Sequence, residues 1–583
     1  MKNPKKFMSG LAVLTLSFSA FACSNLPRLT YTDMTILCID HSQMVPEISE
    51  DNEIKKLIEQ KTGVRLEETV LDDRVEAEIE HMIDDDTLPD LIFSDCICAG
   101  ESLEDFYDMG ILVAWDEYLE KYPNLKGMYT DEEWDAFRQE DGKIYWSGIY
   151  GDYYGNDTTP TCSDFYFAIQ ARVLEAYDYP EIKTLDDYFD ILERFSRDYP
   201  TMPDGSDVIA YTCICEDFRY YCLERAPVLL DGYPYDSCIV NIDNGTLNPT
   251  VVDYNVTPTA EAYFRKLHEE YINGYMDPDF ATMTFDEYLD KLSTGRVLGL
   301  AEFMANLSYY VMDAFSEERT SADGTIYTLS ELGCDYVPLA LTIDEGITPH
   351  HRTSQWYSNY GYSGLAYGTN GIAVTTSCED PDKAFAYLND LLSQDIHDLR
   401  YWGIEGVDYL VDSETGLFYR TEEMRANWND AEYLSSHACQ YQYMLQMSGM
   451  SHDGINRMLP QEQPSEFIAT LSEPLQNCLR AYDADNFVEF LGSVECEPYP
   501  WFPVADNYFI NTLQGDPLDA YADSRAVMHE WLPIVITSAD FDTAWSQYTD
   551  AYNAANPQIY FDYMQEDLDY RIERMIEYYG WEG

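Results

Sequence analysis

The chain has 583 residues, with 107 acidic and 34 basic side chains and a formal net charge of −73. A charge of this sign repels phosphate backbones and anionic head groups, so the composition excludes nucleic-acid binding and electrostatic binding to a membrane surface. The acids are spread among apolar residues, which form 46% of the chain. This length and composition predict two or more packed globular units, and the self-repulsion of such a charge favours a monomer.

The N-terminus has the pattern of an export signal. A lysine-containing start precedes the apolar stretch 11–18, which is too short to span a bilayer, so residues 1–22 are predicted to be a signal peptide. The end of this segment, 20–22, followed by Cys23, is similar to a bacterial lipobox. We therefore expect a lipid on Cys23 and a tether over 23–30, with cleavage by ordinary signal peptidase and release of the free protein as the alternative.

The mature chain then alternates between strand and helix patterns. Asp51 is a candidate cap for the first helix and Gly63 for its end. The predicted order is strand 35–39, helix 52–62, strand 64–70, helix 74–83 and a strand starting over 89–93. This rhythm is typical of a parallel sheet with helices on its faces.

Later segments continue the same α/β pattern. Residues 142–146 predict a short strand, and Thr184 with Asp187 forms a capping box that opens an amphipathic helix. Apolar spacing predicts further helices over 541–552 and 559–579. No internal repeat or low-complexity linker divides the chain, so we expect one compact α/β assembly.

Several short segments, in this order, resemble one family. They are Leu57–Val64, which resembles E-K-x-T-G-V, Thr87–Ile92 (G-D-L-P-D-I), Trp115–Leu125 (L-D-D-Y-I-x-K-Y-P-N-L), Asp141–Tyr145 (D-G-K-I-Y), Thr184–Tyr188 (T-L-D-E-Y), Cys378–Leu388 (C-K-H-P-E-A-A-x-K-x-L) and Gly403–Val407 (G-I-E-G-V). Each piece is weak alone, but their order over most of the mature chain is specific. The set resembles the large carbohydrate-type solute-binding lipoproteins related to LipO and LplA.

The resemblance implies a two-lobe, periplasmic-binding-protein-like α/β fold of type II, with a hinge and a ligand cleft between the lobes. It also implies capture of a carbohydrate, a neutral oligosaccharide, at the outer face of the membrane and delivery to the permease subunits of an ABC importer. The chain is expected to cross between lobes near Gly151, Gly333 and Asp395. The implied division is lobe 1 over 31–151 and 333–395, and lobe 2 over 152–332 and 396–583.

A sugar site needs aromatic faces for C–H groups and carboxylates or amides for hydroxyls. The chain has 50 tyrosines and 10 tryptophans. Only the position of an aromatic residue can therefore distinguish a ring that stacks on the ligand from a ring that packs in the core. Asp95 follows an apolar strand at its carboxyl end, where α/β sheets place ligands. The other candidates lie in aromatic runs near the expected crossings or in a Gly/Ser/Asn-rich loop. The predicted ligand-binding residues are Asp95, Trp146, Tyr150, Trp356, Tyr357 and Trp402, with hinge packing as the alternative for Trp402.

Other classes of function have less support in the sequence. No G-x-S-x-G, H-E-x-x-H or phosphate-binding glycine loop appears, so we predict no catalytic residue and no cofactor. The pair His350–His351 is too little for metal capture, and the cysteines lack zinc-site spacing, so we predict no metal site. A surface glycan sensor without a permease, a glycan-active enzyme, and a binder of peptide or metal chelate remain as alternatives.

Overall fold

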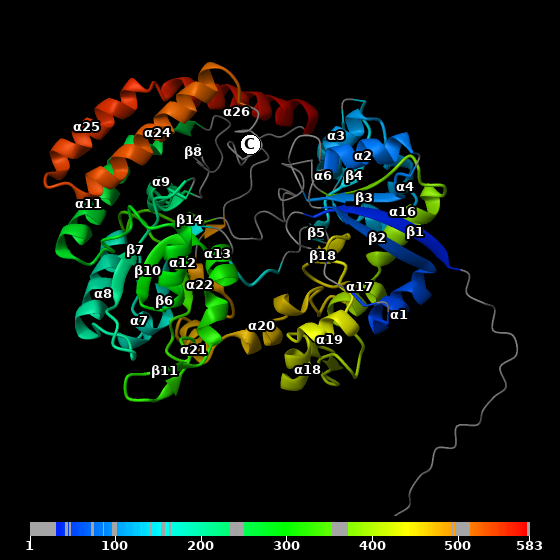
Figure 1. Cartoon of the computed structure of the whole chain (residues 1–583), viewed down its shortest axis with the longest axis horizontal. Helices are drawn as coiled ribbons and strands as arrows, with labels where there is room; N and C mark the ends of the chain where they lie inside the picture. The colour runs from blue at the N-terminus through cyan, green and yellow to red at the C-terminus, as the bar shows by residue number, and fades with distance from the viewer. Residues whose placement is uncertain are drawn as a thin grey trace, which may run out of the picture.

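Two mixed sheets organise the chain in the computed structural model (Figure 1). The structure describes residues 31–40, 45, 48–49, 51–71, 75–85, 87–95, 102–129, 131–139, 141–152, 158–162, 165–217, 219–233, 239–240, 250–351, 371–492, 494–495 and 513–579. The predicted signal peptide, Cys23, Trp356 and Tyr357 lie outside these residues.

The first sheet confirms the predicted strand–helix alternation. Its strand order is β2 (Val64–Leu71), β1 (Thr32–Ile39), β3 (Leu91–Ser94), β15 (Gly371–Val374) and β4 (Trp146–Ser147). The strands β1, β2 and β3 are parallel, while β15 is antiparallel to both of its neighbours. The helices α1 (Glu53–Thr62) and α2 (Val75–Asp84) connect the parallel strands, as the sequence pattern predicts.

The start of α1 differs from the prediction by one residue. Asn52, not Asp51, is the N-cap, and its side chain accepts the backbone N–H of Lys55. Asp51 instead pairs with Lys56 at 2.8 Å on the surface. The end is as predicted, because Gly63 adopts φ 68°, a left-handed conformation that glycine reaches without steric cost.

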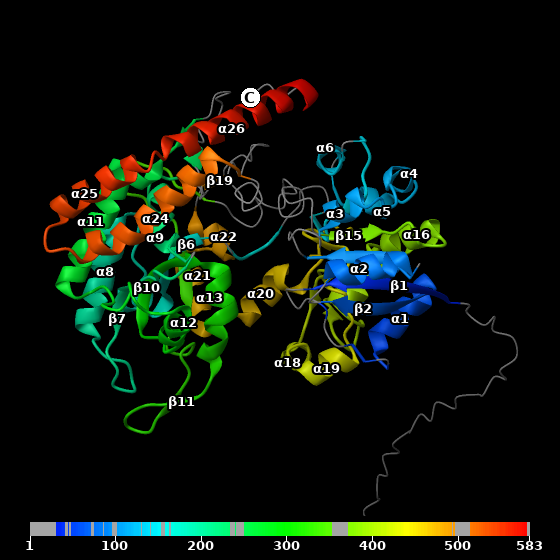
Figure 2. The ribbon, with the colours of Figure 1, turned by 45° about the horizontal axis from the view of Figure 1, so that its top comes forward.

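The second sheet has the strand order β13 (Tyr336–Leu339), β6 (Phe165–Gln170), β10 (Val297–Phe303) and β7 (Ile209–Thr212). Helix α8 (Leu185–Asp198) packs beside it and begins with the capping box that the sequence predicts at Thr184 and Asp187. The C-terminal helices α24 (Asp516–Thr537) and α25 (Phe541–Ala554) lie on this side of the molecule, and α26 (Gln558–Tyr579) begins there and extends towards the first lobe, as Figures 1 and 2 show.

Two groups of buried side chains define two lobes. The first surrounds the first sheet and draws on 34–149 and 372–458. The second surrounds the second sheet and draws on 162–341 and 467–552. The change of lobe after Ile149 is close to the crossing predicted near Gly151.

The other two predicted crossings do not coincide with the limits of these cores. Gly333 lies within the second lobe, where its carbonyl oxygen accepts the N–H of Arg172 at 2.8 Å and β13 follows it into the second sheet. Asp395 lies within the first lobe, where it pairs with Lys61 of α1 at 2.6 Å. The core changes instead after Leu341 and after Met458, so 396–458 belongs to the first lobe and 333–341 to the second.

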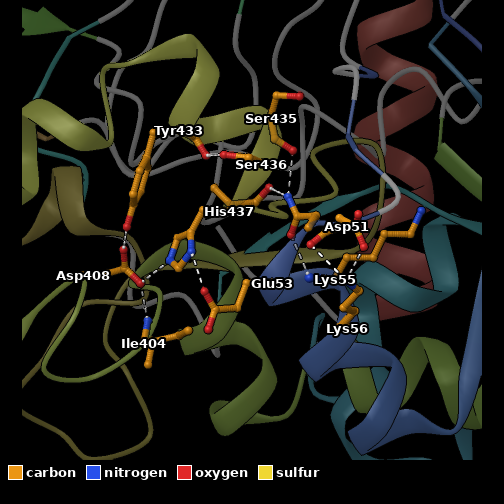
Figure 3. Close-up of polar contacts among 12 residues, drawn as sticks. Asp51, Glu53, Lys55, Lys56, Ile404, Asp408, Tyr433, Ser435, Ser436 and His437 are labelled. Carbon is orange, nitrogen blue, oxygen red and sulfur yellow. Dashed lines mark hydrogen bonds and ion pairs between the residues drawn. The ribbon is translucent and has the colours of Figure 1, made fainter.

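Hydrogen bonds dock the segment 404–438 onto the start of α1 (Figure 3). The amide of the buried Asn52 donates to the carbonyl oxygens of Ser435 and Ala438, at 3.1 and 2.7 Å. The N–H of Ile54 donates to the carbonyl oxygen of His437 at 3.2 Å. Segments almost 400 residues apart in the chain therefore form one lobe.

A buried carboxylate organises the docked segment. Asp408 accepts hydrogen bonds from the backbone of Ile404, the indole of Trp428 and the hydroxyl of Tyr433 at 2.6–2.9 Å. It also lies 2.9 Å from Nε2 of His437, whose Nδ1 is 3.2 Å from a carboxylate oxygen of Glu53 on α1. Burial alone would raise the pKa of Asp408, but these hydrogen bonds hold it below its usual value.

Candidate functional site

The carboxyl ends of β1 and β3 meet at one edge of the first sheet. Asp95 directly follows β3, as predicted, and its N–H donates to the carbonyl oxygen of Ile39 at 3.1 Å. Asp40 follows β1 and accepts the N–H of Val45 at 2.9 Å. The structure thus places two carboxylates at the edge where α/β sheets present ligand-binding groups, and a ligand role for Asp95 stays a prediction.

Trp146 lies in the core of the first lobe. It is on β4, its side chain is only 1% exposed, and its ring packs edge to face with that of Tyr107, with the ring centroids 6.5 Å apart. An indole covered in this way offers no face to a sugar in this structure. Among the described residues of this aromatic run, Tyr150 is the exposed one.

Trp402 is also fully buried. Its Nε1 donates to the carbonyl oxygen of Arg457 at 3.0 Å, and its ring meets Phe418 edge to face at 5.3 Å. Trp402 is thus packed in the interior, while the change of lobe core lies further along the chain, after Met458. Trp356 and Tyr357 lie outside the described residues, so their roles stay predictions.

Tyr150 is 52% exposed and lines a cavity of about 310 Å³. It lies on β5 (Tyr150–Asp152), which pairs in parallel with β18 (Gln446–Ser448). A Cβ at Gly151 would come within 3.0 Å of the carbonyl oxygen of Met128, so β5 can pack this closely only with glycine there. The lining residues are Tyr150, Gly151, Tyr401, Gln440, Gln442, Gln446, Met447, Ser448, Leu459 and Gln461.

Glutamine amides provide most of the polar groups of this cavity, and hydrogen bonds fix their orientation. Tyr401 donates its hydroxyl to Oε1 of Gln446 at 2.5 Å, and Nε2 of Gln446 donates to the carbonyl oxygen of Gln442 at 3.0 Å. The side chain of Gln442 in turn donates to Oε1 of Gln440 at 3.0 Å. Burial raises the pKa of Tyr401 to about 12, so its hydroxyl remains a donor at neutral pH.

The cavity lies beside two of the segments that join the lobes. Tyr150 and Gly151 precede the first crossing, while Leu459 and Gln461 lie on the last, just before α20 (Pro464–Thr470). These two crossings are tied together, because Thr158 donates to the buried carboxylate of Glu462 at 3.1 Å. A ligand in the cavity would therefore contact both the first lobe and the segments on which lobe movement depends.

Comparisons with known proteins identify the fold. No family model matches the chain, and no curated protein matches it. An extracellular solute-binding protein from Bifidobacterium longum subsp. infantis shares 12% identity over 93% of this chain and 99% of its own, with a TM-score of 0.56. An HMO-binding, ABC-transporter-associated solute-binding protein from Bifidobacterium longum infantis shares 13% identity over 92% and 99%, with a TM-score of 0.53.

The chain has the two-lobe fold of solute-binding proteins. The predicted fold class is thereby confirmed. Within this fold the cavity beside Tyr150 is the candidate ligand site, because it adjoins two of the three crossing segments. In the described part of the chain, no helix is long and apolar enough to cross a bilayer.

Candidate metal ligands do not gather in the described residues, where no group of three or more His, Cys, Asp or Glu side chains is arranged to hold an ion. The cysteines Cys213 and Cys222 are free thiols within the core of the second lobe. Burial raises the pKa of both thiols, which keeps them protonated and poorly reactive.

Sequence reasoning missed the glutamines of the cavity. A signal was present, since Gln440, Gln442 and Gln446 occur within seven residues of an otherwise apolar and aromatic stretch. Polar amides repeated in such a stretch are expected to have partners or a ligand, because burying an unpaired amide is costly. The predicted site residues are aromatic or acidic, so these amides are not among them.

Proposed function

We propose that this protein is the extracellular substrate-binding component of an ABC importer and that it captures a neutral oligosaccharide between its two lobes. The observation that carries the proposal is the cavity lined by Tyr150 and four glutamines, placed against two crossing segments of a solute-binding fold. One of the two similar proteins binds HMO and is associated with an ABC transporter, which agrees with this proposal.

The chemistry of the cavity favours an uncharged, hydroxyl-rich ligand. An amide offers both a donor and an acceptor, which matches the two capacities of a sugar hydroxyl. The ring of Tyr150 offers an apolar face for C–H groups. Every side chain that lines the cavity is uncharged, and the net charge of −73 disfavours an anionic sugar.

The anchor and location are part of the proposal. A lipid on Cys23 would hold the protein at the outer face of the membrane, and the strong negative charge supports a monomer that meets its permease there. Replacement Cys23→Ser should move the protein from the membrane fraction to the medium. Recovery of unacylated wild-type protein from the medium would favour simple secretion.

Two alternatives have different consequences. A surface glycan sensor would bind the same sugars without a permease, so genes for permease subunits beside this one distinguish the two. A glycan-active enzyme of the usual kind needs a pair of carboxyl groups at the sugar, whereas the lining of this cavity has none. We therefore propose binding without turnover.

Thermal melting with a panel of sugars tests the function. Lacto-N-tetraose, maltotetraose and kestose are neutral probes, and sialyllactose is the charged comparison. At least one neutral probe should raise the melting temperature by mass action and return unchanged on chromatography. A shortened product would place the protein among the enzymes, and a response to sialyllactose alone would contradict the neutral ligand.

A further inference from the structure

Arg400 is a buried charge whose hydrogen bonds all go to the main chain. It lies on α17 (Gln394–Tyr401), and its side chain is 0% exposed. Its Nε donates to the carbonyl oxygen of Gln440 at 2.8 Å, and its Nη2 donates to that of Tyr441 at 3.0 Å. Its Nη1 donates to the carbonyl oxygens of Leu445 at 2.6 Å and Leu391 at 3.3 Å. Burying a guanidinium is costly, so this arrangement indicates a specific use.

Three of the four acceptors belong to the segment that brings the glutamines to the cavity. The carbonyl groups of residues 440, 441 and 445 point at the guanidinium, while Gln440, Gln442 and Gln446 line the cavity. A planar guanidinium holds several acceptors in a fixed geometry, which a lysine ammonium cannot reproduce. The position of this segment therefore depends on Arg400.

The same segment contains a strained residue. Tyr441 has φ 49°, in the left-handed region that residues with a side chain rarely adopt. Its carbonyl oxygen accepts bonds from both Arg400 and the N–H of Met444, the latter at 2.8 Å. Strain of this kind persists only where surrounding contacts fix it, and it is concentrated at ligand sites.

Helix α17 also fixes the side chain of Gln446. Tyr401, the next residue after Arg400, orients the amide of Gln446 through its hydroxyl. Two consecutive side chains of one helix thus control the backbone and the amides of a single wall of the cavity.

We propose that Arg400 is a positioning residue for ligand binding: it holds the segment 440–446 in the strained conformation that presents Gln440 and Gln442 to sugar hydroxyls. This inference rests on the proposed function of the cavity. In this proposal, Arg400 contributes measurably to the ligand affinity although it does not touch the ligand.

A matched pair of arginine variants tests the proposal. Arg172 in the second lobe makes the same kind of bond, from Nη2 to the carbonyl oxygen of Gly295 at 3.0 Å, away from the cavity. Binding of lacto-N-tetraose, maltotetraose and kestose is measured by titration calorimetry below the melting temperature of each variant. Arg400→Lys should bind the tightest of these sugars roughly tenfold more weakly, the effect of about one lost oriented hydrogen bond, whereas Arg172→Lys should stay within about twofold of wild type.

Amide hydrogen exchange of the unliganded protein separates a local change from general destabilisation, which would accelerate exchange throughout the first lobe. Exchange over 440–446 should accelerate in Arg400→Lys and not in Arg172→Lys. Wild-type affinity in folded Arg400→Lys would overturn the positioning role and leave the proposed function intact. Absence of binding by wild type to all three sugars would overturn the proposed function first.

Two cavity variants keep the test decisive if Arg400→Lys does not fold. The side chains of Gln440 and Gln442 are partly or fully exposed, so Gln440→Ala and Gln442→Ala are expected to fold. Each should weaken binding of the same sugar by roughly fivefold. Unchanged affinity in both would overturn the proposal, since there would be no ligand-binding amide for Arg400 to position.

Discussion

Buried tyrosine rings fill the second lobe, whereas buried charges hold segment 396–446 of the first. In the second lobe, Tyr188 and Tyr336 are fully covered, and each donates its hydroxyl to a strand carbonyl oxygen at 2.8 Å. In the first lobe, Arg400 and Asp408 make four hydrogen bonds each with little or no exposure.

Buried tyrosines and buried charges respond differently to single substitutions. Removing a hydroxyl from a buried tyrosine leaves most of its apolar area buried, so the loss is limited to one hydrogen bond. Removing one charge from a buried network leaves several partners without a bond, and the loss is larger. Segment 396–446 should therefore be more sensitive to single polar substitutions than the buried tyrosines of the second lobe.

Trp146→Ala is expected to have the largest effect, because this large side chain is almost fully covered in the core of the first lobe. Removal of this covered indole should cost about 3–5 kcal/mol of the free energy of unfolding, measured in urea. Affinity for sugar should not change at a temperature where the variant is folded. Lost binding at an unchanged melting temperature would show instead that Trp146 reaches the ligand.

Asp408→Asn tests the charge network directly. An amide offers one acceptor oxygen, and its NH₂ group would face donors, so the free energy of unfolding should fall by about 3 kcal/mol. Glu405→Gln, an exposed change three residues away, is the control and should stay within about 0.5 kcal/mol of wild type. Equal losses of the free energy of unfolding in the two variants would show that the hydrogen bonds of Asp408 add no stability.

The second lobe also contains a carboxyl group that resists ionisation. Burial, opposed by Lys266 and reinforced by Glu193, raises the pKa of Glu270 to about 7. The folded state therefore favours the protonated form of Glu270. The free energy of unfolding falls as pH rises from about 4.5 to about 7, and this residue causes no further loss above that pH.

Glu270→Gln should abolish this loss, because the amide keeps a hydrogen without titrating. Its melting temperature should match that of wild type near pH 5 and exceed it at pH 8, by an amount equivalent to roughly 1–2 kcal/mol after allowance for solvent screening. A variant that is less stable than wild type at pH 8 would mean that Glu270 is ionised in the fold and paired with Lys266.

Tyr188→Phe should have the smallest effect. It removes the hydroxyl that donates to the carbonyl oxygen of Ala168 at 2.8 Å and lies 3.4 Å from that of Leu300, at an expected cost of about 1 kcal/mol in urea unfolding. A loss as large as that of Asp408→Asn would remove the distinction between the lobes.

The sequence predicts the elements whose cores are apolar. The stripe of α8, the spacing of α25 and the alternation of β1, α1 and β2 follow from helix and strand periodicity, and these elements are found where expected. The place of segment 396–458 in the first lobe could not be predicted in this way. Arg400, Asp408 and His437 look like surface residues in a sequence with 107 acids, and only the fold brings them under cover.

The candidate site, like the fold, could be predicted only in part from the sequence. Position along the chain places Asp95 after its strand, where the structure has it, while the exposure of Tyr150 near the first crossing comes from the structure. It cannot distinguish these residues from Trp146 and Trp402, because an aromatic side chain near a crossing can equally fill the core. The amides of the cavity depend on a strained segment and on Arg400, neither of which has a local sequence pattern.

The central claim is that the cavity between Tyr150 and the segment 440–446 binds a neutral oligosaccharide. Amide hydrogen exchange with and without a saturating neutral sugar from the panel tests it most directly, because it reports where the ligand slows exchange. We predict new protection at 149–152 and 440–448, together with protection of the crossing segment at 459–463 as the lobes close. Protection confined to other parts of the chain, with these segments unchanged, would contradict the claim.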